Sequence, residues 1–166
     1  VLGPRGAGVG ELQGVENRIA LTVGTLSKAL GSIGGFIAAA TPVIETLINE
    51  ARSFIYTTAL PPACCAAALA ALRIVEREPA RRERVCALAA YVRGELSRMG
   101  FDCGVAAGDD TVTPIIPVLL GDAATALRAA RQLQDRGIWV PAIRPPTVPP
   151  ETARLLQHWR HHKFTG

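Results

Sequence analysis

Lys28 lies in the segment Gly24-Thr25-Leu26-Ser27-Lys28-Ala29-Leu30-Gly31 and is one of two lysines in the chain. The rest of its 18 basic residues are arginines, so this sequence uses arginine almost everywhere that a positive charge is needed. A lysine amine can lose its proton and attack a carbonyl carbon, whereas a guanidinium stays charged. The segment therefore predicts a chemical role for Lys28 that arginine could not fill.

Hydroxyl groups and glycines surround this lysine. Thr25 and Ser27 precede it, and Gly31-Ser32-Ile33-Gly34-Gly35 follows it. Glycines let a backbone approach a ligand closely, and hydroxyls with free backbone N–H groups bind phosphate oxygens. A lysine here could clamp a phosphate, although the P-loop pattern GxxxxGK[ST] is absent. It could instead capture a carbonyl, helped by apolar neighbours that favour the neutral amine. A structural Ser-Lys turn without chemistry is the third interpretation.

Composition narrows the class of protein. A chain of 166 residues, 49% of them hydrophobic, can form a domain with a core. The net charge of +4 is spread along predicted helices without interleaved aromatic residues, which argues against nucleic-acid binding. No signal peptide or membrane-length apolar run occurs, so we expect a cytoplasmic protein without a membrane partner.

The cysteines form no CxxC motif and have no neighbouring histidine, which argues against a zinc site or a disulfide framework; they are Cys64, Cys65, Cys86 and Cys103. Cys64 and Cys65 lie in an alanine-rich run, and we expect them to be small core residues of a helix.

Strand and helix patterns alternate along the chain, which predicts an α/β fold. A glycine-rich loop is expected at 1–14, strands at 19–23, 34–40, 54–58, 112–120 and 138–143, and helices at 41–51, 62–77, 79–99 and 122–136. Thr41 is the expected N-cap of the first helix, with Pro42 at its first position, and Asp122 is the N-cap of the last, which ends at Gly137. Pro114 and Pro117 place their strand at a sheet edge.

The break at Glu78-Pro79 is the predicted domain boundary, giving 1–78, 79–154 and an atypical tail, 155–166. The tail has no strand alternation and carries His158, His161 and His162. We expect a misread or out-of-frame end there, with a metal site as the alternative.

Three separated segments carry a resemblance to a known family: Thr25–Gly35, Phe54–Pro62 and Gly137–Pro149. They resemble, in this order, segments of the α-oxoamine synthases, which are pyridoxal-phosphate (PLP) enzymes of fold type I, with a fold like that of aspartate aminotransferase. The third segment is more similar to the biotin-pathway branch of the family than to the branches that use glycine or serine.

The resemblance implies PLP as cofactor and a role for each matching residue. Lys28 would bond to the cofactor aldehyde and move the α-proton of the amino-acid substrate. The other implied roles are phosphate binding by Thr25 and more weakly by Ser27, phosphate binding across a dimer interface by Thr58, and substrate contacts by Tyr56, Arg144 and Thr147. A bidentate guanidinium suits a substrate carboxylate. From the residues alone, Tyr56 and Thr58 also fit an ordinary strand, and Arg144 a solvated loop.

The resemblance also implies substrates and an assembly. The branch condenses L-alanine with a pimeloyl thioester, on coenzyme A or a carrier protein, and works as a homodimer. The alternatives are a synthase that joins glycine or serine to an acyl-CoA, and a non-catalytic remnant that keeps the fold.

The sequence departs from the family at both ends. The Asp-x-x-His segment that the family places before the equivalent of Val1-Leu2-Gly3 is not in this sequence, and its Asp supports the pyridine nitrogen of the cofactor. We therefore expect a partial large domain, an incomplete small domain, and little or no synthase activity in the isolated chain. After Arg154 the family's alternating strand is not recognisable, so we expect the sheet of 112–120 and 138–143 to have an unpaired edge.

Overall fold

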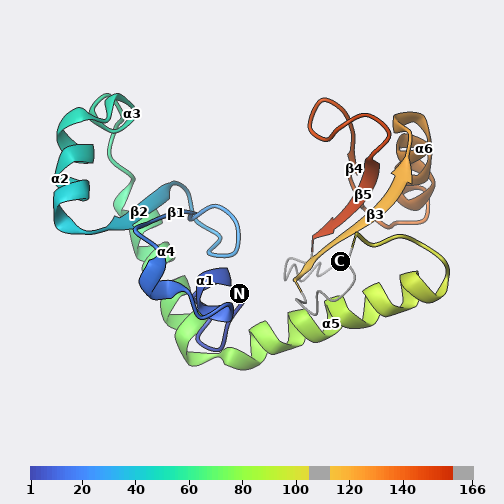
Figure 1. The fold of residues 1–166 in the computed structure, drawn as a ribbon, viewed down its shortest axis with the longest axis horizontal. Helices are drawn as coiled ribbons and strands as arrows, with labels where there is room; N and C mark the ends of the chain where they lie inside the picture. The colour runs from blue at the N-terminus through green and yellow to red at the C-terminus, as the bar shows by residue number, and fades with distance from the viewer. Residues whose placement is uncertain (105–112, 159–166) are drawn as a thin grey trace. The chain divides into compact units, whose positions relative to one another are not determined.

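The computed structural model describes residues 1–104 and 113–158. Helices and strands alternate along the described chain, which confirms the predicted α/β class (Figure 1). The chain divides into two compact units, Val1–Arg82 and Glu83–Gly166. The division falls inside helix α5, Pro79–Arg98, close to the predicted boundary at Pro79. The assignment of the units to a large and a small domain stays a prediction.

An antiparallel hairpin carries the lysine segment in the first unit. Its strands are β1, Leu21–Thr25, and β2, Gly35–Ala39. Thr25 pairs with Gly35, and this is the last pair before the loop that connects the strands. Both strands were expected from their apolar residues, and β1 lies two residues later than predicted. Thr25 is therefore the last paired residue of β1, and Lys28 lies in the hairpin loop.

The N-terminal segment is more ordered than the predicted loop. It contains the short helix α1, Val9–Leu12, and the 3₁₀ helix η1, Glu16–Arg18. The Glu11 carboxylate accepts hydrogen bonds from the backbone N–H of Arg5 at 3.0 Å and of Ala7 at 2.9 Å, and from Arg5 Nε at 2.7 Å. These bonds lower the pKa of Glu11 to about 2, with the Arg5 side chain as the largest cause.

Helix α2, Thr41–Glu50, is confirmed, but its predicted cap is wrong. Ala40 occupies the N-cap position, and Thr41 is the first helical residue, with no side-chain hydrogen bond closing the end. Pro42 lies in the first turn, where its missing N–H costs nothing, because the first N–H groups of a helix have no partner within it.

The strand predicted at 54–58 is wrong. Residues Arg52–Ile55 form a single helical turn, α3, in which the N–H of Tyr56 donates to the carbonyl of Arg52 at 3.1 Å. Strand preference reflects packing against neighbouring strands, and no strand of the described chain lies beside this segment. The Arg52 guanidinium lies 6.0 Å from the centre of the Tyr56 ring.

Two helices follow as predicted: α4, Pro62–Arg77, and α5, Pro79–Arg98. Each begins at a proline, whose fixed φ suits the first helical position. Cys64 is half-buried and Cys65 is exposed, so the predicted core role is wrong for this pair. Ala68 is the buried apolar residue of α4, whereas Leu69 is 51% exposed and Leu72 46%.

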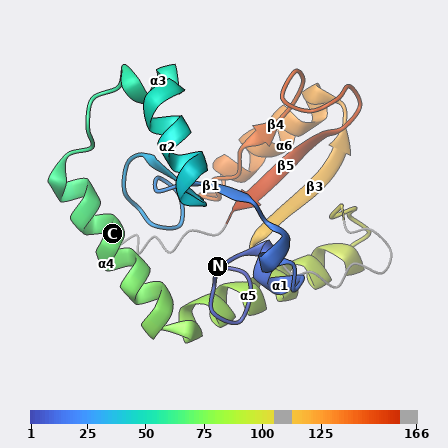
Figure 2. The same cartoon turned by 60° about the vertical axis from the view of Figure 1, so that its left-hand side comes forward.

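The second unit packs α6, Ala123–Gln134, against a three-stranded antiparallel sheet (Figures 1 and 2). The sheet order is β3–β5–β4, with β3 at Ile115–Gly121, β4 at Ala142–Ile143 and β5 at Ala153–His158. β4 is much shorter than the predicted strand 138–143. The predicted cap is confirmed, since Asp122 Oδ1 accepts a hydrogen bond from the N–H of Thr125 at 2.8 Å.

Strand β5 corrects the prediction for the tail. It is the central strand of the sheet and pairs with both β3 and β4, so the expected unpaired edge between those strands is wrong. The burial pattern explains its position: Ala153 is 0% exposed and Leu155 is 7% exposed, whereas Arg154 and Leu156 between and after them are half-buried. His161 and His162 lie outside the described residues.

The placement of β3 at an edge is confirmed. Its inward side chains Ile116, at 0% exposure, and Val118, at 9%, belong to the core of the unit. Ile116 packs with Ala89 of α5 and with Cys103, which is the buried cysteine of the chain.

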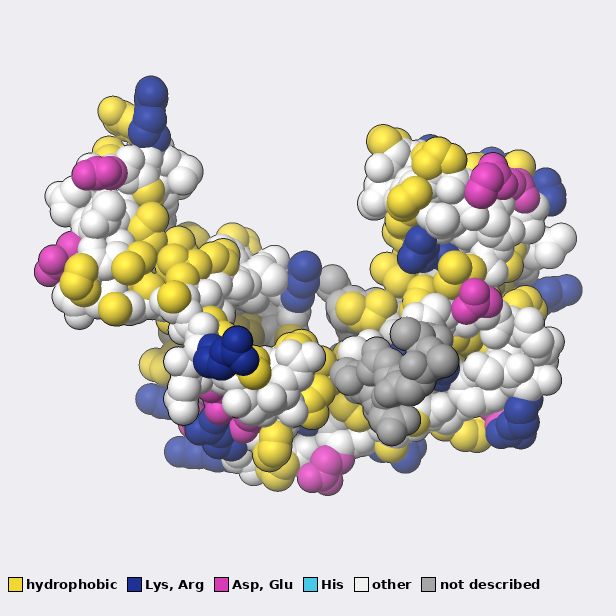
Figure 3. All heavy atoms as spheres, viewed as in Figure 1, with side chains coloured by type: hydrophobic (Ala, Val, Ile, Leu, Met, Phe, Trp, Pro, Cys, Tyr) yellow, Lys and Arg dark blue, Asp and Glu magenta, His cyan; other side chains and the backbone are white. Residues whose placement is uncertain are grey.

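The first unit leaves much of its apolar surface uncovered. Figure 3 shows hydrophobic side chains gathered on the surface where α2 meets the hairpin. Val23 is 70% exposed, Ile33 63% and Phe54 58%. Within residues 1–104 and 113–158, no helix is both long enough and apolar enough to cross a membrane.

Candidate active site

The Lys28 loop is closed by a short ladder of backbone hydrogen bonds. The N–H of Leu26 donates to the carbonyl of Gly34 at 2.9 Å, and the N–H of Ser32 donates to the carbonyl of Leu26 at 2.8 Å. Inside this closure, the N–H of Gly31 donates to the carbonyl of Lys28 at 3.1 Å. Gly31 and Gly34 have φ of 62° and 103°, which side chains rarely allow, so the glycines of the motif are what permit this tight turn.

The two predicted phosphate-binding hydroxyls lie together. Thr25 Oγ1 and Ser27 Oγ are 2.8 Å apart and share a hydrogen bond, and the N–H of Ser27 donates to Thr25 Oγ1 at 3.2 Å. Both residues are exposed. Each hydroxyl can rotate to donate its proton to an incoming anion, since hydroxyls both donate and accept. The geometry supports a small oxyanion-binding group at the start of the loop.

Lys28 is exposed, and within the described residues its amino group has neither a hydrogen bond nor an ion pair. The amine is thus accessible to a ligand. The apolar enclosure expected around it is not formed by the described part of the chain, because Leu26 and Leu30 beside it are only half-buried.

Tyr56 and Thr58 lie in the first unit with Lys28. Tyr56 ends the α3 turn and is 79% exposed, and Thr58 is exposed in the segment that leads to α4. This segment contacts the lysine loop two residues after Thr58, because a Cβ placed on Gly34 would lie 2.8 Å from Leu60 Cδ1. The structure therefore brings the Thr58 segment against the base of the Lys28 loop. Within the described residues, the side chains of Tyr56 and Thr58 make no hydrogen bond to that loop.

Arg144 and Thr147 lie together in the second unit, just after β4. The N–H of Thr147 donates to the carbonyl of Arg144 at 3.1 Å, which closes a turn through Pro145 and Pro146. Both side chains are exposed, and the Arg144 guanidinium makes no ion pair with any described carboxylate. Its donors are available for a ligand carboxylate. The contact of Arg144 with a substrate carboxylate stays a prediction.

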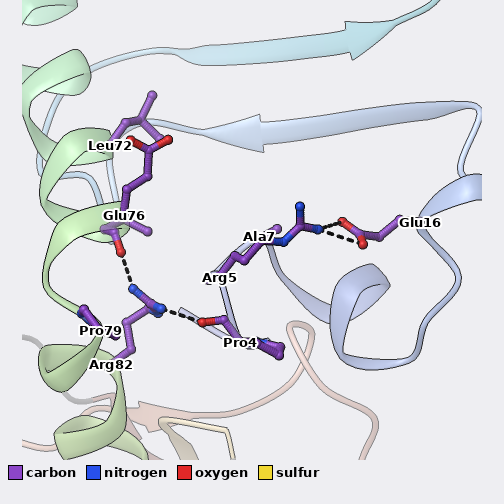
Figure 4. A pocket seen from close by; sticks show the side chains of 10 residues that line it. Pro4, Arg5, Ala7, Glu16, Leu72, Glu76, Pro79 and Arg82 are labelled. Carbon is purple, nitrogen blue, oxygen red and sulfur yellow. Dashed lines mark hydrogen bonds and ion pairs between the residues drawn. The ribbon is translucent and has the colours of Figure 1, made fainter.

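A separate cavity in the first unit, of about 550 Å³, contains none of the predicted site residues. Figure 4 shows Arg82 beside it, donating to the carbonyl of Pro4 at 2.8 Å and to that of Val75. Arg82 thereby fastens the N-terminal segment to α4. In the described part of the chain, no group of three or more His, Cys, Asp or Glu side chains could hold a metal ion.

The sequence does not identify Ser32, Leu60 or Cys64 as residues that hold the lysine loop in place. Ser32 Oγ donates to the carbonyl of Cys64 at 2.7 Å, from the loop to the first turn of α4. The only available signal was the position of Ser32 between two glycines of the motif, which indicates a constrained loop but not the partner.

Residues 3–156 match the family described as aminotransferase class I and II, and the chain belongs to that family. The predicted fold type I class of PLP-dependent enzymes is confirmed by this match and by the solved structures that resemble the chain.

Among curated proteins, the chain is similar to the 8-amino-7-oxononanoate synthase of Anaeromyxobacter dehalogenans strain 2CP-C. The two are 51% identical over 155 residues, which cover 93% of this chain and 38% of that protein. The resemblance to the α-oxoamine synthases is thus confirmed. The chain spans about two fifths of the length of this relative.

Two solved structures show the same fold. The serine palmitoyltransferase of S. paucimobilis, with a bound PLP–myriocin aldimine, has a TM-score of 0.87 and 34% identity, over 95% of this chain and 39% of that one. The 8-amino-7-oxononanoate synthase of Francisella tularensis has a TM-score of 0.80 and 29% identity, over 95% of this chain and 45% of that one.

Proposed function

We propose that this chain is part of a PLP-dependent 8-amino-7-oxononanoate synthase. The whole enzyme would condense L-alanine with a pimeloyl thioester, held on coenzyme A or a carrier protein, and release carbon dioxide and the free thiol. The main support is the lysine loop, in which one exposed amine follows two hydroxyls that lie 2.8 Å apart. The 51% identity to a relative of that name supports the choice of reaction.

The residues of the loop fit the cofactor. PLP carries an aldehyde, a pyridine ring and a phosphate, and the loop supplies an amine for the first and hydroxyl donors for the last. When bound, the cofactor draws electrons from the substrate Cα and so makes its proton removable. Lys28 holds the cofactor and then takes that proton, and Thr25 and Ser27 hold the phosphate, with Thr25 as the stronger donor site.

The remaining predicted residues serve the substrate. Arg144 offers a guanidinium without a protein partner among the described residues, which suits the carboxylate of the amino acid or of the acyl chain. Thr147 lies in the same turn and would add a hydroxyl contact. Tyr56, at 79% exposure, would contact the substrate from the segment before Thr58.

We also propose a homodimer, in which Thr58 binds the cofactor phosphate of the partner. The support is the exposed apolar segment before it, with Phe54 58% and Tyr56 79% exposed. Sedimentation analysis of a protein extended to the full length of its relatives tests the dimer, and a monomer at micromolar concentration would contradict it.

We propose the cytoplasm as the location of the protein, since all four cysteines are free, as is usual in a reducing compartment.

A synthase that uses serine and an acyl-CoA is the second candidate, because serine palmitoyltransferases resemble the chain at a TM-score of 0.87. The two candidate reactions are separated by product analysis of a protein extended to the full length of its relatives. Alanine, glycine and serine are each supplied with pimeloyl-CoA and with palmitoyl-CoA. Alanine with pimeloyl-CoA is the expected pair.

The first test is an absorbance titration of the purified chain with PLP, with Lys28→Ala beside it. We expect a new visible band in the wild type and none in the variant, since alanine has no amine. Lys163 remains in both proteins and controls for capture by the other lysine. Equal bands in both proteins, or a band in neither, would contradict cofactor capture by Lys28.

A further inference from the structure

The lysine loop has one hydrogen bond that ties it to an element outside its own hairpin, within the described residues. Ser32 Oγ donates to the carbonyl of Cys64 at 2.7 Å, across 32 residues of chain. All other hydrogen bonds of residues 24–35 stay within the hairpin. Ser32 is half-buried, and its hydroxyl is therefore better shielded from water than the exposed Thr25 and Ser27.

Two hydrogen-bond donors of Ser32, its backbone N–H and its hydroxyl, act on the position of Lys28. Its N–H donates to the carbonyl of Leu26 at 2.8 Å and so closes the turn that contains Lys28. Its hydroxyl then fixes the closed turn to Cys64, the third residue of α4. Lys28 lies within the closed turn, two residues after Leu26 and four residues before Ser32.

A second contact supports the same junction. Gly34, two residues after Ser32, packs so closely on Leu60 that a Cβ would lie 2.8 Å from both Leu60 Cδ atoms. The carbonyl of Gly34 accepts from the N–H of Leu26 at 2.9 Å and from Thr25 Oγ1 at 3.4 Å. The start of α4 and the segment before it thus hold the side of the loop that follows the lysine.

We propose that Ser32 is a positioning residue, which holds the Lys28 amine at the distance from Thr25 and Ser27 that lets a single PLP molecule meet all three. This inference rests on the proposed function. PLP presents its aldehyde and its phosphate at fixed positions on one rigid ring, so the amine and the hydroxyls must be held at a matching separation. A loop anchored only through its own hairpin would let that separation vary, which lowers the rate of capture even where each group stays accessible.

The test compares two aldehydes in the 166-residue chain: PLP, and pyridoxal, which lacks the phosphate. Borohydride fixes the product, and peptide mass mapping counts modification at Lys28 alone. We expect Ser32→Ala to lower the ratio of the PLP rate to the pyridoxal rate about fivefold, as for loss of one ordinary hydrogen bond. Ser32→Thr keeps the hydroxyl and should restore the ratio. Ser53→Ala, on the exposed face of α3, is the matched control and should leave it unchanged.

Amide hydrogen exchange of the cofactor-free variants checks the anchor itself. We expect peptides covering 26–34 to exchange about fivefold faster in Ser32→Ala, with β3 and β5 unchanged, because the lost bond is local. Unchanged loop exchange would overturn the anchor. Faster exchange with an unchanged rate ratio would reduce Ser32 to a structural residue and overturn the positioning role. Absence of capture at Lys28 in the wild type would instead overturn the proposed function, and with it the positioning role.

Discussion

The hydroxyls of Thr25 and Ser27 are hydrogen-bonded to each other, but the two residues differ in their other hydrogen bonds. Thr25 Oγ1 accepts from the N–H of Ser27 at 3.2 Å and reaches the carbonyl of Gly34 at 3.4 Å, whereas the Ser27 hydroxyl bonds to Thr25 alone among the described residues. Thr25 is also fixed by its position as the last residue of β1. A preorganised donor loses less entropy on binding than a mobile one. We therefore expect Thr25 to bind the cofactor phosphate more strongly than Ser27.

We expect Thr25→Val to weaken PLP binding by about tenfold or more, because a hydrogen bond to a charged group contributes about 1.5–3 kcal/mol. Ser27→Ala should weaken it less. The dissociation constants come from absorbance titration of each variant. Thr22→Val changes the same residue type in the same strand without a side-chain hydrogen bond and is the control. Equal loss in Thr22→Val would show an effect of the strand rather than of the hydroxyl.

Glu11 offers a pH-dependent prediction at the N-terminal turn. Its folded pKa is about 2, below the ordinary 4.5, because Arg5 and two backbone N–H groups favour the charged carboxylate. A carboxylate with a lowered folded pKa stabilises the fold at pH above its unfolded value, and this contribution is lost as the pH falls through the folded pKa. Glu11 therefore stabilises the fold fully above pH 4.5 and loses that effect near pH 2.

We expect Glu11→Gln to unfold at lower urea concentration than the wild type at pH 7, with the difference shrinking between pH 4.5 and 2. Urea titrations at several pH values measure this. Glu50→Gln, at the exposed end of α2, is the control and should follow the wild type. A difference that is constant over the whole pH range would contradict the ionic origin.

At the scale of elements, two glycines predict opposite effects of the same substitution. Gly34 has φ of 103° and packs on Leu60, whereas Gly94 lies within α5 with open space around its Cβ position. We expect Gly34→Ala to destabilise the fold by about 1–3 kcal/mol, because the backbone conformation is strained for alanine. Gly94→Ala should stabilise it by about 1 kcal/mol, through helix propensity. Thermal unfolding by circular dichroism measures both, and a stabilised Gly34→Ala would contradict the observed loop.

The elements that sequence predicts well are those whose signals are local. Proline at the first position starts α4 and α5, and the side chain of Asp122 caps α6, so these helices follow from neighbouring residues. The segment 54–58 has residues typical of a strand and forms a turn, because strands need partners that lie elsewhere in the chain. The reverse holds for β5: its sequence lacks the alternation typical of a strand, yet it forms a strand because it pairs with both β3 and β4.

The same distinction applies to the candidate site. The lysine, its hydroxyls and its glycines are contiguous, and the structure places them at the end of β1, in the loop that follows and at the start of β2. The Ser32–Cys64 bond joins residues 32 positions apart through one side chain and one backbone carbonyl. Every residue has a backbone carbonyl, so the residue type at position 64 could not have predicted the contact. Contacts of this kind become visible only in the structure.

At the scale of the whole molecule, burial is distributed unequally between the two units. Of the apolar residues buried in the described chain, Ala68 belongs to the first unit, whereas Ile116, Val118 and Leu155 are among those of the second. Apolar side chains in the hairpin remain in contact with water, as Val23 at 70% and Phe36 at 42% exposure illustrate. Because burial of apolar area is the main stabilising contribution to a fold, the first unit gains less stability from burial than the second.

We therefore expect amides of β1 and β2 to exchange with solvent at least about tenfold faster than those of β3 and β5, a difference of about 1.4 kcal/mol in the free energy of opening. Hydrogen exchange followed by mass spectrometry of the chain at low micromolar concentration measures this. Repeating it at tenfold higher concentration controls for association through the exposed apolar side chains. Slow exchange in the hairpin that disappears on dilution would mean that a second copy covers it. Slow exchange at every concentration would contradict a dependence of hairpin stability on apolar burial, since the chain alone would then protect a hairpin whose side chains lie in water.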